Sequence, residues 1–194
     1  VSDVPAPSRS RPPEYVAIGL IQDAEAYRVA AMRVHPSRET FGAREVDLLA
    51  PAWHLLCHSS ELALKAYLLS TGVDQGSKKG GLMHSSIRHN LNGLYQWAME
   101  RGFEPPDEDF GDLIEFLDPY HSAHVFRYRE PDRMPFVPPF VIADILKPVI
   151  SGVARTVRAK WKATREAGSD DADLASVGLA QAQPPESNTK PSRG

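Results

Sequence analysis

The fold is decided by residues 51–69, which read PAWHLLCHSSELALKAYLL. Apolar side chains recur every three or four positions on two faces of this segment. They are Trp53, Leu56, Leu64 and Tyr67 on one face, and Leu55, Leu62 and Leu69 on the other. A helix that is apolar on two faces lies at the centre of its domain. Pro51 suits a first helical position, although the helix can also begin near Ala43 and bend at the proline, and Gly72 suits its end.

The same spacing predicts helices on both sides of this segment. A helix is expected over residues 14–34, and Pro36 ends it. Another is expected over residues 91–101, with Asn90 as its N-cap. Residues 107–109 open a fourth helix, which Pro119 interrupts and a short helical piece over 120–128 continues. The last is expected over 139–167 with a kink at Pro148. No stretch alternates as a strand does, so an all-α bundle of about five helices is predicted.

Composition sets the domain boundaries. The chain has 194 residues, of which 42% are hydrophobic, and this suits one domain. Residues 1–13 hold four prolines and almost no large apolar side chain. Residues 169–194 are also poor in large apolar residues and end in a proline-rich segment. We therefore predict a disordered N-terminal arm over 1–13, a globular domain over 14–168 and a disordered tail over 169–194.

Several classes of protein are disfavoured. No apolar run reaches the roughly 20 residues that span a bilayer, so no membrane partner is expected. The single cysteine, Cys57, excludes an internal disulfide and a cysteine zinc cluster. The N-terminal residues lack the apolar centre of a secretory signal, and a reducing, cytoplasmic location is expected. The net charge of −3 gives no overall sign of nucleic-acid binding.

Polar side chains line one face of the central segment. His54, His58 and Glu61 follow one another in steps of four and three, a spacing that can bind a metal. The alternative is a polar seam that faces water or a partner, and we expect neither a metal nor a cofactor here. Glu61 and Lys65 stand four apart in the order that favours an ion pair.

A second polar row is formed by His121, His124 and Arg127. A histidine can move protons near neutral pH while an arginine holds a phosphate, so the pair suits cleavage of RNA without a metal. Alternatively, the histidines cap the core after Pro119 and Arg127 pairs with an acid such as Asp118.

A third row is basic and lies near the end of the last predicted helix. It consists of Arg155, Arg158, Lys162 and Arg165. Such a row can contact a phosphate backbone. It can equally be a solvated face whose cations complement the negative end of the helix dipole.

Three segments together resemble the HEPN superfamily. They are ELALKAYLL at 61–69, the His89-Asn90-Leu91 start of a helix that ends near Gly102, and Arg127-Tyr128. The resemblance covers about residues 45–160, and ELALKAYLL is its most specific part. It implies a helical bundle that forms homodimers, and a role as a ribonuclease or as an inactive binding module in toxin–antitoxin, phage-defence or RNA-processing systems.

One feature of active HEPN members is missing. Those members resemble one another in an R-x(4–6)-H motif near the start of a late helix. Here Arg127 is followed by Tyr128, and no histidine occurs in the next seven positions. The resemblance therefore predicts a module without the standard HEPN ribonuclease activity.

These observations lead to one leading hypothesis. We expect a cytoplasmic HEPN-like protein that associates with RNA or a nucleotide, with an antitoxin or another protein as a further partner. Lys65, His89 and Arg127 are the candidate substrate-binding residues, and His124 and Arg127 are the candidate catalytic residues. Any activity is expected to be that of a metal-independent endoribonuclease.

Two alternatives remain at this point. In the first, the chain is a structural or regulatory dimeric protein without a catalytic site, and Glu61, Lys65 and Arg127 form a buried ion-pair network that fixes the packing of the helices. In the second, His54, His58 and Glu61 hold a metal. The first alternative expects the charges of Glu61, Lys65 and Arg127 to face one another inside the domain. The leading hypothesis expects them to open onto a groove.

Overall fold

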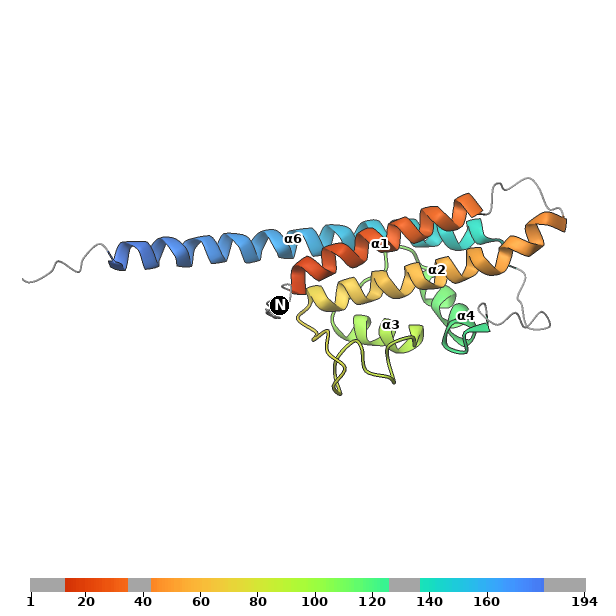
Figure 1. Cartoon of the computed structure of the whole chain (residues 1–194), viewed down its shortest axis with the longest axis horizontal. Coiled ribbons are helices and arrows are strands. Elements are labelled where there is room, and N and C mark those ends of the chain that lie inside the picture. The colour runs from red at the N-terminus through yellow and green to blue at the C-terminus, as the bar shows by residue number, and fades with distance from the viewer. Residues whose placement is uncertain (1–12, 35–42, 126–136, 180–194) are drawn as a thin grey trace, which may run out of the picture. The chain divides into compact units, whose positions relative to one another are not determined.

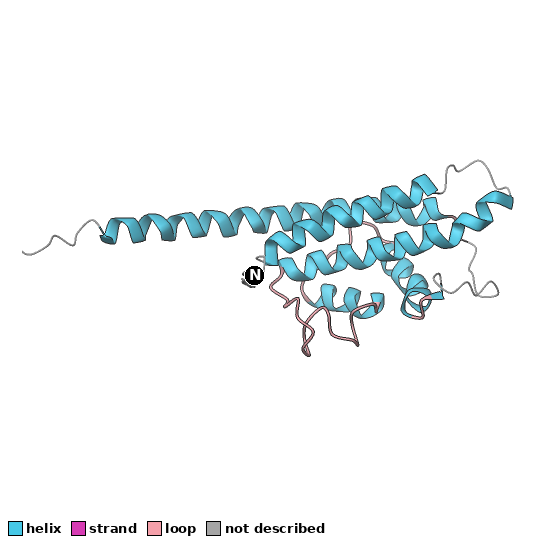
Figure 2. Ribbon diagram, viewed as in Figure 1, coloured by secondary structure: helices cyan, strands magenta, loops and turns pink. Residues whose placement is uncertain are grey.

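The computed structural model describes residues 13–34, 43–125 and 137–179. Within these ranges the chain forms five α-helices and no strands, so the predicted all-α bundle is confirmed. The helices are α1 (Pro13–Val34), α2 (Ala43–Ser70), α3 (Leu91–Glu100), α4 (Phe110–Ser122) and α6 (Pro139–Leu179). Figure 2 shows that loops connect helices only. Arg127 and the N-terminal residues 1–12 lie outside the described part.

Helix α2 is the centre of the bundle, as its two apolar faces predict. It packs along much of its length against α1, and also contacts α3 and α4. Figure 1 shows α1 on one side of α2, with α3 and α4 on the other. Every residue from Ser59 to Leu69 is buried, which is why this helix can carry apolar side chains on both faces.

The core joins side chains from all five helices. Leu56, Leu64, Phe110, Ile114 and Leu146 are among its largest fully buried members. Two polar groups inside it have partners: the Ser59 hydroxyl donates to the Ala24 carbonyl over 2.7 Å, and the Trp53 indole donates to the Val137 carbonyl over 2.9 Å. Polar groups that are satisfied in this way add directional contacts to apolar packing.

Two compact units divide the chain, residues 1–161 and residues 162–194. The first contains the core. In the second, the described part is the C-terminal portion of α6, which is helical to Leu179. The backbone at 169–179 is therefore helical where the sequence predicts a disordered tail. No proline interrupts this segment, and alanine and leucine residues with high helix propensity lie within it.

Two prolines bear on the helix boundaries. Helix α2 begins at Ala43 with Pro51 inside it, which confirms the alternative start near Ala43 rather than a start at Pro51. Helix α4 continues through Pro119 to Ser122, where the sequence predicts an interruption. Pro119 is exposed, so water can bind the Glu115 carbonyl that loses its helical partner. Residues 126–128 of the short helical piece expected after Pro119 lie outside the described part.

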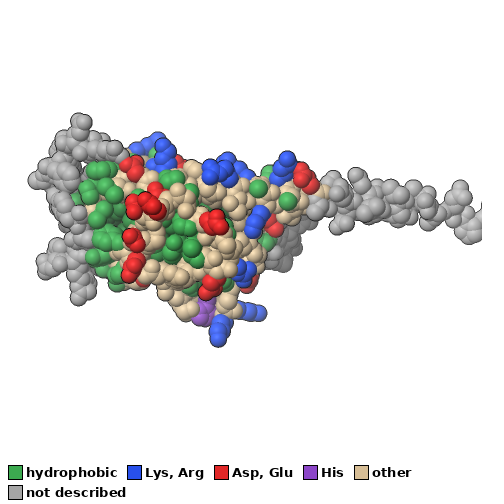
Figure 3. Space-filling view, turned by 180° about the vertical axis from the view of Figure 1, so that it is seen from behind, with side chains coloured by type: hydrophobic (Ala, Val, Ile, Leu, Met, Phe, Trp, Pro, Cys, Tyr) green, Lys and Arg blue, Asp and Glu red, His purple; other side chains and the backbone are tan. Residues whose placement is uncertain are grey.

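No described helix combines the length and apolar character needed to cross a bilayer. On the face shown in Figure 3, acidic and basic side chains both occur, with apolar side chains between them. That face therefore carries no broad field of one sign.

Candidate functional site

Glu61 is the centre of a buried polar cluster in the middle of α2. Its side chain is only 2% exposed, and both of its carboxylate oxygens are in contact with nitrogen atoms. The Lys65 ammonium lies 2.5 Å from Oε1. On Oε2, the His121 Nε2 lies at 2.6 Å and the His89 Nδ1 at 3.2 Å. We call Glu61, Lys65, His89 and His121 the Glu61 cluster.

Local structure explains how these groups meet. Lys65 follows Glu61 by one helical turn, so both side chains lie on the same face of α2. His89 immediately precedes Asn90, whose side chain accepts a 2.6 Å hydrogen bond from the Gly93 amide as the N-cap of α3. His121 lies in the last turn of α4. A 3.2 Å bond from the Asn92 amide to Asp118 then ties the start of α3 to α4.

The electrostatics of Glu61 follow from these contacts. Burial by itself raises the pKa of its carboxyl group, but interactions with His121 and His58 and the charge of Lys65 outweigh burial and hold the pKa well below its usual range. Glu61 is therefore an ionised carboxylate at neutral pH. Lys65 is itself 8% exposed and also donates to the Arg88 carbonyl over 2.7 Å. The two opposite charges thus neutralise each other inside the domain.

One side of the cluster borders a pocket of about 350 Å³, which we call the histidine pocket. Its polar walls come from α2 and from the loop between α2 and α3, and its apolar walls include a side chain of α1. The lining residues are Leu20, His58, Glu61, Leu62, Lys65, Leu69, Gln75, Leu82, Met83, Arg88 and His89. His58 and His89 are about one third exposed. Solvent therefore reaches the imidazoles while Glu61 stays buried behind them.

The outer wall of this pocket is a loop that is fixed at both ends. At the α2 end, the Val73 amide donates to the Leu68 carbonyl over 3.2 Å, and Gly72 adopts a φ of 86°. Such a positive φ favours glycine in a helix C-cap. In the middle, Leu82 is buried and its amide donates to the Asp74 backbone carbonyl over 2.9 Å. At the α3 end, the Asn90 cap holds the chain.

Several candidate residues from the sequence lie together. His89 contacts His124, with ring centroids 5.5 Å apart, and contacts His121 at 6.0 Å. Lys65 reaches the same place through the Arg88 carbonyl. Arg127, the remaining candidate residue, lies outside the described part of the chain. His124 has a φ of 56°, a left-handed conformation that is uncommon for a residue with a side chain.

The residues that could hold a metal differ from the set expected from the sequence. The rings of His54 and His58 stack with centroids 6.5 Å apart, and His58 Nδ1 is 3.8 Å from Glu61 Oε2. The described residues whose ligand atoms gather most closely are instead Glu61, His89 and His121. The contact between His121 and Glu61 has no signal in the sequence, because 60 positions separate the two residues and no local pattern connects them.

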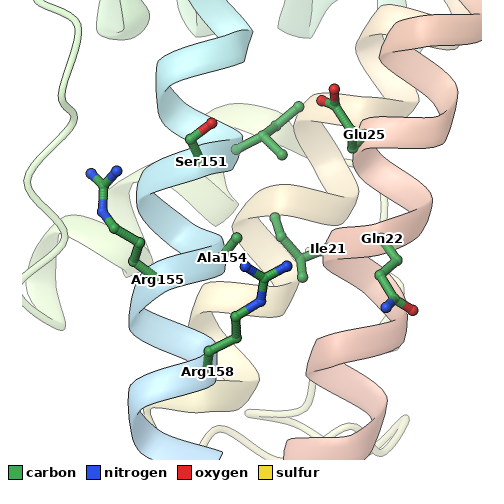
Figure 4. A pocket seen from close by; sticks show the side chains of 8 residues that line it. Ile21, Gln22, Glu25, Ser151, Ala154, Arg155 and Arg158 are labelled. Carbon is green, nitrogen blue, oxygen red and sulfur yellow. The ribbon is translucent and has the colours of Figure 1, made fainter.

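The basic row on α6 lies at a different surface. Arg155 and Arg158 line a pocket of about 510 Å³ between α6 and α1, and Glu25 lines it from α1. Figure 4 shows Arg158 extending over a floor that includes Ile21 and Ala154. In the second unit, Lys162 lies 3.7 Å from Glu166. Of the row, Lys162 thus has an acidic side chain beside it, which weakens its attraction for a phosphate backbone. Glu25 in the first pocket is itself paired with Arg28.

Comparison with protein-family models, with curated protein sequences and with solved structures finds no match for this chain. The class of the protein is therefore defined by its own features. These are an all-α bundle and a buried carboxylate that binds one ammonium and two imidazole groups beside a pocket.

Proposed function

We propose that the chain is a HEPN-like module that binds RNA or a nucleotide in the histidine pocket and lacks the standard HEPN ribonuclease activity. One observation carries this proposal. The two segments that support the resemblance within the described residues, ELALKAYLL and His89-Asn90-Leu91, meet around one carboxylate, with Glu61 Oε2 3.2 Å from His89 Nδ1. A homodimer, an antitoxin partner and a defence or toxin–antitoxin setting belong to the same proposal, because the resemblance implies them.

The chemistry of the pocket supports a ligand with a phosphate and a flat base. Arg88 is exposed at its rim, and among the described residues no carboxylate pairs with its guanidinium group. An arginine can bind a phosphate through two parallel hydrogen bonds. Leu20, Leu82 and Met83 form an apolar wall of the pocket, which suits the flat base. A volume of about 350 Å³ suits one nucleotide rather than a long oligonucleotide.

A structural or regulatory protein without a catalytic site is the second candidate. Its support is that Glu61 and Lys65 satisfy each other at 2.5 Å and are both buried. A buried ion pair of this kind can fix the register of packed helices. In this case the cluster holds α2, α3 and α4 together, and the pocket has no ligand.

Binding measurements separate the two candidates. Fluorescence polarisation with a labelled single-stranded oligoribonucleotide, and calorimetry with nucleoside monophosphates, are applied to the wild type and to Arg88→Gln and Arg127→Ala. The control is Arg33→Gln, which removes the same charge at the end of α1. The proposal expects tighter binding by the wild type and by Arg33→Gln than by the other two variants. Equal or absent binding in all four proteins supports the second candidate.

A ribonuclease assay tests the activity. His124→Asn is preferable to an alanine variant because asparagine tolerates the left-handed backbone at this position. The proposal expects no cleavage by the wild type. Cleavage that His124→Asn and Arg127→Ala both reduce contradicts that expectation and identifies the chain as a ribonuclease.

A further inference from the structure

Three ligand atoms of the Glu61 cluster converge on one point. Glu61 Oε2, His89 Nδ1 and His121 Nε2 all lie within 4.8 Å of one another. They come from three separate elements: α2, the residue before the N-cap of α3, and the last turn of α4. We infer that these three side chains form a binding site for one divalent transition-metal ion of the zinc type. The sequence predicts no metal here, so this inference differs from the expectation of a metal-independent site.

The donor set selects the kind of ion. Two imidazole nitrogens and one carboxylate oxygen suit zinc, cobalt or nickel, whereas calcium and magnesium prefer oxygen ligands. In a tetrahedral zinc site, bonds of about 2.0–2.1 Å place neighbouring ligand atoms roughly 3.3 Å apart. The Glu61–His89 distance of 3.2 Å already has this value, and the Glu61–His121 distance of 2.6 Å has to widen by less than 1 Å.

Lys65 prepares the carboxylate for this role. Its ammonium lies on Oε1, while both histidines lie on Oε2. The two oxygens are therefore divided between the ammonium and the ion, and Glu61 binds the ion through one oxygen. Residues that orient a ligand in this way are a usual part of metal sites.

The pocket leaves room for further ligands. Glu61 and His89 both line it, and His58 Nδ1 is 3.8 Å from Glu61 Oε2. His58 is thus near enough to become a fourth ligand after a small side-chain movement. Otherwise a water molecule or an anion from the pocket completes the coordination, which is the arrangement of catalytic rather than structural zinc sites.

The main alternative is a cluster held by hydrogen bonds alone. Both histidines can donate a ring N–H to Glu61, and the cluster is then complete without an ion. Metal binding is measured without RNA, so its result is independent of the proposed function. RNA binding can fail while the metal binds, and the reverse can also occur.

The experiment uses the full chain without a histidine tag, after dialysis against a chelator. Calorimetry measures the binding of Zn²⁺, and the visible absorption of Co²⁺ reports the coordination geometry. We expect one ion per chain and a Co²⁺ spectrum with intense bands of a four- or five-coordinate site. Zn²⁺ should also raise the midpoint of thermal unfolding, because it binds the folded state.

The variants identify the ligands. His89→Ala removes a partly exposed ligand and is expected to weaken Zn²⁺ binding by at least about 10-fold to 100-fold. The matched control is His84→Ala in the same loop, whose imidazole binds Ser86 at 2.7 Å outside the cluster. His121→Gln gives a second ligand test, with circular dichroism to verify its fold. Absent Zn²⁺ binding, or equal loss in His89→Ala and His84→Ala, overturns the inference.

Discussion

Glu61 is a charged side chain held almost wholly out of water, and its ionisation depends on its neighbours. Taking a carboxylate out of water costs several kcal/mol unless a cation and hydrogen-bond donors replace the water. Lys65 and two histidines provide this replacement. Removal of one partner leaves the other as an uncompensated buried group, so removal of both members of the ion pair is expected to cost less than the sum of the two single removals.

This expectation can be tested with Lys65→Met, Glu61→Gln and the double variant. Each single substitution leaves a buried group without its partner, and we expect a loss of about 3–5 kcal/mol in the free energy of unfolding. The double variant should lose clearly less than the sum, because no charge is then left unpaired. Denaturant unfolding followed by circular dichroism measures all three. Additive losses would show that Glu61 and Lys65 do not interact.

Cys57 provides a second prediction at this scale. Its side chain is fully buried, and burial together with the negative charges of Glu61 and Asp118 raises the pKa of its thiol. The thiolate is the reactive form. We expect the native protein to react with Ellman's reagent far more slowly than the denatured protein, at a rate that follows unfolding. Rapid reaction of the native protein at pH 8 would contradict this packing.

Single residues also show the limits of sequence reasoning. Glu61 and Lys65 share a helix face because of their spacing, which the sequence reveals directly. His89 and His121 lie 28 and 60 positions from Glu61, and only the packing of three elements brings them together. Their partnership thus depends on loop geometry that no periodicity encodes. His89 is singled out in the sequence through the His89-Asn90-Leu91 segment that resembles the HEPN superfamily.

Helices as elements were easier to predict than their ends. The apolar periodicity identified every described helix, and Asn90 marked the start of α3 correctly. Proline was a weaker marker of helix ends: α4 continues through Pro119, and α2 begins at Ala43 rather than at Pro51, whereas Pro148 lies inside α6 as predicted. The cost of a proline in a helix can be offset by packing on both sides of it. Periodicity therefore predicts the elements, and tertiary contacts decide where they end.

Substitution of two glycines by alanine should change the free energy of unfolding in opposite directions. Gly19 lies inside α1, and a Cβ atom there would meet no atom within 4 Å. Gly19→Ala should raise the free energy of unfolding by about 0.5–1 kcal/mol, because alanine favours the helix. Gly81 is in the loop beside the histidine pocket, and its Cβ would lie 2.0 Å from the Gly76 carbonyl oxygen. Gly81→Ala should lower it by about 1–3 kcal/mol. Denaturant unfolding measures the change in the free energy of unfolding for each variant. A change of the same sign in both would contradict the placement of Gly19 in an uncrowded helix and of Gly81 in a crowded loop.

The whole molecule is described by one folded unit and a C-terminal segment. All buried core residues among those described lie between Ala17 and Val157, within residues 1–161. The stability of this unit should therefore be independent of the residues after it. The sequence predicts a domain that ends at 168, and that boundary stays a prediction.

Truncation tests this independence. A chain that ends at Glu166 should keep the free energy of unfolding of the full chain to within about 0.5 kcal/mol. A chain that ends at Gly152 is the matched control, because it lacks the buried Val153 and Val157 and should be clearly less stable. Thermal and denaturant unfolding compare the three proteins. Equal destabilisation by both truncations would show that the last residues support the core.

The loop that lines the histidine pocket has a fixed backbone and exposed side chains. Its backbone is anchored at the Gly72 turn, at Leu82 and at the Asn90 cap, whereas the side chains of Gln75, Met83 and Arg88 are exposed. Those three positions can be exchanged without disturbing the charged floor beneath them. Under the proposed function, substitution at these three positions should change the ligand preference of the pocket, and a library randomised there would sample new specificities on an unaltered bundle.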